Sequence, residues 1–191
     1  MNPKRWQDHL RRVLASHHPC DAAPSGFRRA AVLVPLYEAP DGPGVLLVQR
    51  TERVPTHKGQ ISFPGGGYHE SDGTLQATAL REAREEIGLH PEDVTLLGRL
   101  DDVVAAASAH VVRPFVGLAP HAYPFRLDPF EVERLIHLPL GPLLHGAPFR
   151  EEVWTRDGAP HSVFFYEADG ETVWGLTARI LKRLVELVRA A

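Results

Sequence analysis

The stretch from Thr74 to Gly88, TLQATALREAREEIG, is the feature that most constrains the fold, because it contains good helix formers and ends in a glycine stop. On an α-helix, Glu82, Glu85 and Glu86 fall within an arc of about 100°. The sequence therefore predicts an amphipathic helix with a packed apolar face and an acidic face that looks outward. The residues expected on the adjoining, packed side are Gln76, Leu80, Ala83 and Ile87.

Three neighbouring carboxylates repel one another, so their grouping needs an explanation. A solvated helix face is the simplest one. The loop before the helix adds a second observation: residues 63–67 read FPGGG, and glycine lets backbone amides come close to a ligand such as phosphate. Carboxylates without nearby thiolates or zinc-spaced histidines suit Mg²⁺ or Mn²⁺, which often bridge to substrate phosphates. We interpret the glutamates as a cation site.

Strands outnumber helices in the rest of the chain. A short amphipathic helix is expected to end at Pro19, so that residues 1–28 form this helix and a lead-in. Glycine and proline over residues 61–73 predict no regular element there. The remaining expectations are a hairpin of 31–37 and 44–49, strands in 94–104 and 110–119, a turn or short strand in 128–140, a late hairpin of 150–156 and 161–168, and a closing helix over 177–191.

Length and charge limit the possible classes of protein. We expect one domain over residues 1–191, since this length can bury a core and no linker or repeat is visible. A formal net charge of -3 argues against a nucleic-acid surface, and no apolar run could span a bilayer. The single cysteine, Cys20, cannot form an internal disulfide, and no leader pattern opens the chain. The sequence predicts a cytoplasmic protein without nucleic-acid or membrane partners.

The segment from Gly66 to Leu89 resembles the signature of the Nudix hydrolases. The general pattern has a glutamate eight residues before the arginine, where this chain has Gly73; the nearby acid is Asp72. The resemblance implies an α/β fold, the Nudix α/β/α sandwich with a mixed sheet between helices. The positions that match the pattern are Arg81, Glu82, Glu85, Glu86, Gly88 and Leu89.

The upstream segment LLVQRTERVPTHKGQISFPGG resembles the motif of the coenzyme A diphosphatase branch of this family. Val48 stands where that motif favours threonine, and Pro55 stands where it favours arginine. The matching positions are Leu46, Leu47, Arg50, Gly59, Phe63, Pro64, Gly65 and Gly66.

The resemblance implies roles for the acidic residues. Glu82 and Glu86 would hold Mg²⁺ or Mn²⁺, with Glu85 as a third metal ligand or as a base that acts through metal-bound water; Glu85 and Glu86 are thus the catalytic candidates. Arg81 and Asp72 would form an ion pair that fixes the loop on the helix. Some relatives supply a general base from outside the motif, and the candidates here are Asp101, Asp102, Glu131 and Glu133. Glu70 is a surface carboxylate or a group that approaches the metal.

The basic residues nearest to the motif are Arg50, Arg53, His57 and Lys58. They are candidates for neutralising the substrate's phosphates, including the 3′-phosphate of coenzyme A. For Arg53, His57 and Lys58, ordinary surface charge is an equal alternative, whereas Arg50 matches the branch motif. Gly65 and Gly66 complete the candidate substrate-binding set through their backbone amides.

The reaction that the resemblance implies is metal-dependent hydrolysis of coenzyme A to 4′-phosphopantetheine and adenosine 3′,5′-bisphosphate. ADP-ribose or another nucleoside diphosphate derivative is an alternative substrate, and a noncatalytic nucleotide-binding module is an alternative of another class. The sequence leaves open the number of ions, the phosphorus that is attacked, the preference for free or acylated coenzyme A, and the oligomeric state.

Overall fold

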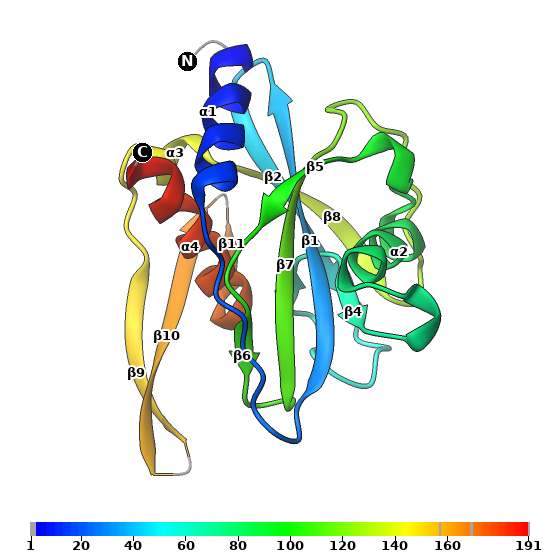
Figure 1. The fold of residues 1–191 in the computed structure, drawn as a ribbon, viewed down its shortest axis with the longest axis vertical. Helices are drawn as coiled ribbons and strands as arrows, with labels where there is room; N and C mark the ends of the chain where they lie inside the picture. Colours follow the sequence, from blue (N-terminus) through cyan, green and yellow to red (C-terminus); the bar gives the residue numbers. More distant parts are fainter. Residues whose placement is uncertain (1–2, 157, 169, 191) are drawn as a thin grey trace.

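A mixed β-sheet forms the centre of the computed structural model, which describes residues 3–156, 158–168 and 170–190 (Figure 1). Five strands follow one another in the order β3-β2-β1-β7-β5. Three further strands pair with members of this series: β4 with β1, β6 with β7 and β8 with β2. The pairing of β1 with β7 is parallel and the other pairings are antiparallel. The strands are β1 Arg28–Ala39, β2 Gly42–Arg50, β3 Ile61–Ser62, β4 Gly65–Gly67, β5 Thr95–Arg99, β6 Val103–Ala105, β7 His110–Leu118 and β8 Val132–Pro139.

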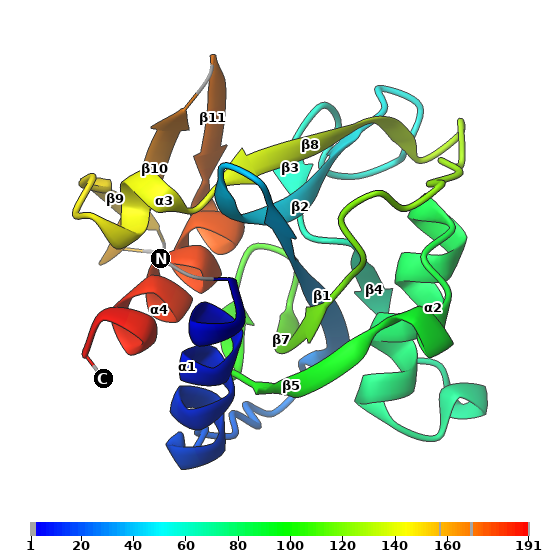
Figure 2. The ribbon, with the colours of Figure 1, turned by 90° about the horizontal axis from the view of Figure 1, so that it is seen from above.

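Helices cover both faces of this sheet (Figure 2). Helix α2, Leu75–Ile87, lies on one face, while α1, Pro3–Ser16, and α4, Gly175–Ala190, lie on the other. Side chains alternate along β1 with period two, so that Leu33 packs under α2 and Val34 packs toward α4. The predicted α/β/α arrangement is thereby confirmed.

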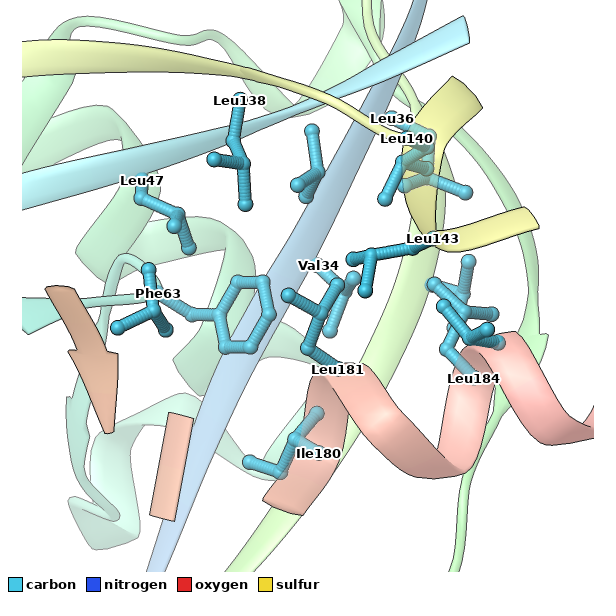
Figure 3. Packing of buried hydrophobic residues seen from close by; sticks show 14 of the residues in the cluster. Val34, Leu36, Leu47, Phe63, Leu138, Leu140, Leu143, Ile180, Leu181 and Leu184 are labelled. Atoms are coloured by element: carbon cyan, nitrogen blue, oxygen red, sulfur yellow. The ribbon is translucent and has the colours of Figure 1, made fainter. Parts of the chain in front are cut away.

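The larger hydrophobic cluster lies between the sheet and α4 (Figure 3). Phe63 projects into it beside Leu47, and both are almost completely buried. Because Phe63 comes directly before Pro64 and β4, its burial ties the glycine-rich segment to the core. Other members are Val34, Leu36, Leu138, Leu140, Leu143, Ile180, Leu181 and Leu184.

A smaller antiparallel sheet in the order β11-β10-β9 packs against α4. Its strands are β9 Arg150–Arg156, β10 Ala159–Ala168 and β11 Glu171–Trp174, and the short helix α3, Gly141–Leu144, precedes it. Tyr166 and Val173 extend from this sheet into the larger cluster. The smaller sheet therefore widens the core on the face opposite to α2.

Most sequence-based predictions of local structure are confirmed, including both hairpins and the helices at the two ends. The prediction that no regular element forms over residues 61–73 is wrong, because β3, β4 and the 3₁₀ turn Glu70–Asp72 lie there. Strand β4 consists of three glycines and forms because it pairs with β1, which local sequence does not reveal. Residues 128–140 contain an eight-residue strand, longer than expected, and β11 was not predicted.

Within the part of the chain that the structure describes, no helix combines the length and the apolar character needed to cross a membrane.

Candidate active site

Helix α2 carries the acidic residues and is fixed at both ends. At its start, the Thr74 hydroxyl accepts a hydrogen bond from the amide of Ala77. At its end, Gly88 adopts a left-handed conformation, and the segment before β8 supplies two further donors: the amides of Arg126 and Asp128 donate to the carbonyls of Ile87 and Glu86. These contacts give the helix a fixed position relative to β8.

Arg81 binds the turn that precedes the helix, as predicted. Its Nε lies 2.8 Å from Asp72 Oδ1, and its Nη2 donates to Asp72 Oδ2 at 3.1 Å. The Thr78 hydroxyl also donates to Asp72. These charge-assisted hydrogen bonds hold the pKa of Asp72 well below its usual range, and the hydrogen bond from Arg81 has the largest effect. The predicted Arg81–Asp72 ion pair is confirmed.

Glu86 lies near the end of α2 with its side chain directed toward β4, and only 2% of its surface is exposed. Its Oε1 accepts a hydrogen bond from Arg50 Nη1 at 3.0 Å, and its Oε2 accepts one from the Gly65 amide at 3.1 Å. Burial raises the pKa of Glu86 to about 8, although Arg50 and the Gly65 amide act in the opposite direction. A buried carboxyl with a raised pKa and two specific partners, close to other acids, is a candidate functional group.

The other two glutamates differ in exposure. The side chain of Glu82 is 14% exposed and contacts Arg81 Nη1 at 2.9 Å, and burial raises its pKa despite that arginine. The side chain of Glu85 is 58% exposed and contacts the same Nη1 at 2.8 Å. The prediction that the acidic face as a whole looks outward is therefore wrong, because Glu82 and Glu86 lie under the glycine-rich strand and only Glu85 faces solvent.

Strand β4 brings the glycine-rich segment against these carboxylates. Gly65 pairs with Val32 of β1 so closely that a Cβ atom at Gly65 would collide with the β1 backbone. A Cβ atom at Gly66 would collide with the carboxylate of Glu82, whereas one at Gly67 would meet no atom within 4 Å. The absence of a side chain at Gly66 therefore leaves the space that the Glu82 carboxylate occupies.

Arg50 enters the site from the end of β2. The pairing of β2 with β8 shifts register between Gln49 and Arg50, and such bulges turn side chains toward functional sites. Its Nη1 contacts Glu86, and its Nη2 lies 3.4 Å from Glu131 Oε2. Arg50 thus joins the helix carboxylate to an acid from a distant part of the chain.

Of the four predicted candidates for an external base, the structure brings Glu131 to this site. Its carbonyl accepts the Thr51 amide, which fixes the start of β8 beside Arg50. Glu133 is exposed, and Asp101 and Asp102 form ion pairs with Arg183 and Arg113. Both aspartates line a hollow of about 380 Å³ together with Arg179, Ile180 and Arg183 of α4.

The other predicted phosphate-binding residues, Arg53, His57 and Lys58, are exposed on the loop between β2 and β3. Arg53 Nη1 donates to the carbonyl of Pro129, and His57 Nδ1 lies 2.9 Å from Gln60 Oε1. Arg50, in contrast, is held by carboxylates. Glu70 is exposed in the 3₁₀ turn.

The side chains around Glu82, Glu85 and Glu86 show whether the site suits a metal ion. In residues 3–156, 158–168 and 170–190, no three His, Cys, Asp or Glu side chains lie close enough together to hold an ion as they stand. Glu82, Glu85 and Glu86 each contact an arginine instead. The donors are nevertheless all carboxylate oxygens, and those of Glu86 are buried, which suits a hard divalent cation. An open hollow of about 550 Å³ lies beside α2, and of the three glutamates it is lined by Glu85 alone, together with Arg81 and Arg84.

Known proteins resemble this chain in sequence and in fold. A family model described as the NUDIX domain matches residues 27–137. A Shigella flexneri protein named "Uncharacterized Nudix hydrolase NudL" is 35% identical over 177 residues, which cover 93% of this chain and 91% of that protein. A protein of the same name from Escherichia coli (strain SMS-3-5 / SECEC) is 37% identical over 157 residues, covering 82% of this chain and 81% of that one.

Solved structures share the fold at low identity. The NUDIX domain of Shewanella oneidensis NrtR complexed with ADP ribose has a TM-score of 0.50 at 22% identity, covering 76% of this chain and 88% of that chain. A C. elegans Ap4A hydrolase binary complex has a TM-score of 0.50 at 20% identity, covering 63% and 85% respectively. A NUDIX hydrolase from Alicyclobacillus acidocaldarius has a TM-score of 0.52 at 20% identity, covering 64% and 83%.

Proposed function

This chain belongs to the NUDIX family of hydrolases, which act on phosphoanhydride bonds, and we propose that its substrate is coenzyme A. The products would be 4′-phosphopantetheine and adenosine 3′,5′-bisphosphate. The observation that supports this choice most is the position of residues 46–66, which carry the resemblance to the coenzyme A diphosphatase branch. Two of them, Arg50 and Gly65, contact Glu86 directly. Residues of the segment that resembles the coenzyme A diphosphatase motif therefore lie next to the glutamates of α2.

The proposed metal ligands are Glu82, Glu85 and Glu86, and the proposed ion is Mg²⁺ or Mn²⁺. When bound, such an ion neutralises the diphosphate and lowers the pKa of the attacking water. Arg81 keeps Glu82 and Glu85 in place because it is itself held by Asp72. The Gly65 amide orients Glu86 from the opposite side. The fold therefore positions the carboxylates before substrate arrives, which favours catalysis.

Proton removal from the attacking water is assigned to a carboxylate. Glu85 and Glu86 are the candidates on the helix, and Glu131 is the candidate from outside the motif. Glu131 is 46% exposed, so it combines access to water with a position 3.4 Å from Arg50. The exposed side chains of Arg53, His57 and Lys58 would bind the outer phosphates of the substrate, among them the 3′-phosphate. Of the two predicted backbone contacts for the diphosphate, the Gly65 amide already donates to Glu86, so the Gly66 amide is the one that we propose.

Hydrolysis of ADP-ribose or another nucleoside diphosphate derivative is the second candidate. The reason to keep it is that Val48 and Pro55 depart from the coenzyme A branch motif, which weakens the match to that branch. Both substrates contain a diphosphate attached to adenosine, so the same carboxylates would act on either. They differ in the 3′-phosphate and in the group beyond the second phosphate. We further propose that residues 1–191 act as one domain and that the protein works in the cytoplasm.

A substrate panel tests these proposals. The protein would be incubated with coenzyme A, dephospho-coenzyme A, acetyl-coenzyme A, ADP-ribose and a dinucleotide, each with Mg²⁺, with Mn²⁺ and with excess chelator. Products would be separated by liquid chromatography and identified by mass. We expect the highest kcat/KM for coenzyme A, with both predicted products and no product under chelator. A higher kcat/KM for ADP-ribose would replace coenzyme A by the second candidate, and chelator-resistant turnover would contradict the metal assignment.

A further inference from the structure

Two arginines divide the acidic residues of the site between them. Arg81 contacts Glu82 and Glu85, while Arg50 contacts Glu86 and Glu131. In this state two guanidinium groups offset part of the negative charge of the four carboxylates. The two arginines differ in what else holds them, and this difference has consequences for metal binding.

Arg81 has a second anchorage. Its Nε and Nη2 bind Asp72, and Nη2 also donates to the carbonyl of Gly67. These contacts involve none of the glutamates. If a cation took the carboxylates of Glu82 and Glu85, the guanidinium of Arg81 would still be held by Asp72.

Arg50 has no comparable anchorage. Its two terminal nitrogens contact Glu86 and Glu131, and its buried Nε has no hydrogen-bond partner in the described part of the chain. The side chain is 17% exposed, so it is not freely solvated either. A guanidinium can donate five hydrogen bonds, and this one depends on two carboxylates. Loss of the contact to Glu86 would leave it bound only through the longer contact to Glu131.

We propose that Arg50 is a resident cation, which neutralises Glu86 and Glu131 in the metal-free protein, competes with the divalent ion, and is released toward the substrate's phosphates when the ion binds. This inference rests on the proposed metal site at Glu82, Glu85 and Glu86. Arg50 binds Oε1 of Glu86 while the Gly65 amide binds Oε2, so an ion that takes Oε1 competes directly with Arg50. A divalent ion carries twice the charge of a guanidinium and therefore competes well for the buried carboxylate. Arg50 then becomes available for bidentate phosphate binding.

Metal affinity gives the first test. Mg²⁺ binding would be measured by calorimetry, without substrate, for the wild type and for Arg50→Met, at pH 8.5 to limit competition by protons. Removing the competing cation should tighten Mg²⁺ binding about tenfold, as expected for the loss of hydrogen bonds between charged groups. Arg84→Met is the matched control, because Arg84 is an exposed arginine on α2, the helix that carries the proposed ligands, and its removal changes the net charge equally. The control should change Mg²⁺ affinity less than twofold.

Thermal stability gives a second test that a merely structural arginine would not pass. Without metal, Arg50→Met should lower Tm because Glu86 loses its counter-charge. With saturating Mg²⁺ the deficit should shrink or vanish, since the ion replaces Arg50. An arginine that only supports the fold would leave the same deficit with and without Mg²⁺.

The outcomes separate this inference from the proposed metal site. If the wild type binds Mg²⁺, Glu86→Gln abolishes binding, and Arg50→Met binds with equal or lower affinity, the metal site stands and the resident-cation role is overturned. If the wild type binds no Mg²⁺, both are overturned. Should Arg50→Met fail to fold, Arg50→Lys replaces it, because lysine keeps the charge but not the planar two-sided contact. Its Mg²⁺ affinity should exceed that of the wild type, and an equal or lower affinity would overturn the role.

Discussion

Arg81 and Asp72 are joined by two hydrogen bonds, with Nε 2.8 Å from Oδ1 and Nη2 3.1 Å from Oδ2. The pair connects the middle of α2 to the turn that follows β4. It therefore fixes the distance between the glycine-rich strand and the glutamates, and its loss should affect both stability and activity.

Asp72→Asn tests this connection. Because the folded-state pKa of Asp72 is held below the unfolded one, the pair contributes stability at pH values above about 4, and this contribution is lost as the pH falls further. At pH 7 we expect Tm to fall by about 3–6 °C. Thermal unfolding across pH 3–8 would show the difference from wild type shrinking on the acidic side. A difference that is constant with pH would contradict the ion pair's role.

Glu86→Gln should reduce kcat by about 10²–10³-fold or more, because the amide cannot supply the charge that a divalent ion needs. The fold should stay intact, since the amide oxygen can still accept the Gly65 amide and a buried charge is removed. Steady-state kinetics and circular dichroism would be compared with the wild type. A nearly normal rate would exclude Glu86 from the metal site.

Gly66→Ala should lower kcat/KM by about 10- to 100-fold with little change in Tm. The added Cβ displaces the carboxylate of Glu82, and small displacements of catalytic groups have effects of this size. Gly66 does not have a positive φ, so alanine introduces no backbone strain there. Gly67→Ala is the matched control on the same strand, where the new methyl group meets no atom within 4 Å. Equal effects of the two substitutions would refute the steric explanation.

Glu131→Gln should lower kcat by about 10²-fold, whereas Glu133→Gln should leave it within twofold. The two acids lie two residues apart, but Glu131 lies 3.4 Å from Arg50 and Glu133 is exposed. The pH dependence of kcat for each variant would show whether an essential base has been lost. Similar kinetics for both variants would remove Glu131 from the proposed mechanism.

Local sequence determines much of what is seen around α2. Its composition and the glycine stop at Gly88 predict the helix to within a residue at each end, because helix formation and termination depend on neighbouring residues. The resemblance to a known signature also predicted the Arg81–Asp72 pair. The alternating apolar runs predict the β1–β2 hairpin for the same local reasons.

Contacts between distant residues were decided by the tertiary structure alone. A helical arc groups Glu82, Glu85 and Glu86, but only the packing of β4 over the helix buries Glu86 and leaves Glu85 exposed. Three glycines form a strand because β1 offers them a partner. Arg50 and Glu131 are 81 residues apart, and a sequence gives no means of choosing Glu131 over three other acids. Periodicity and capping act over a few residues, whereas burial and ion pairing depend on how whole elements pack.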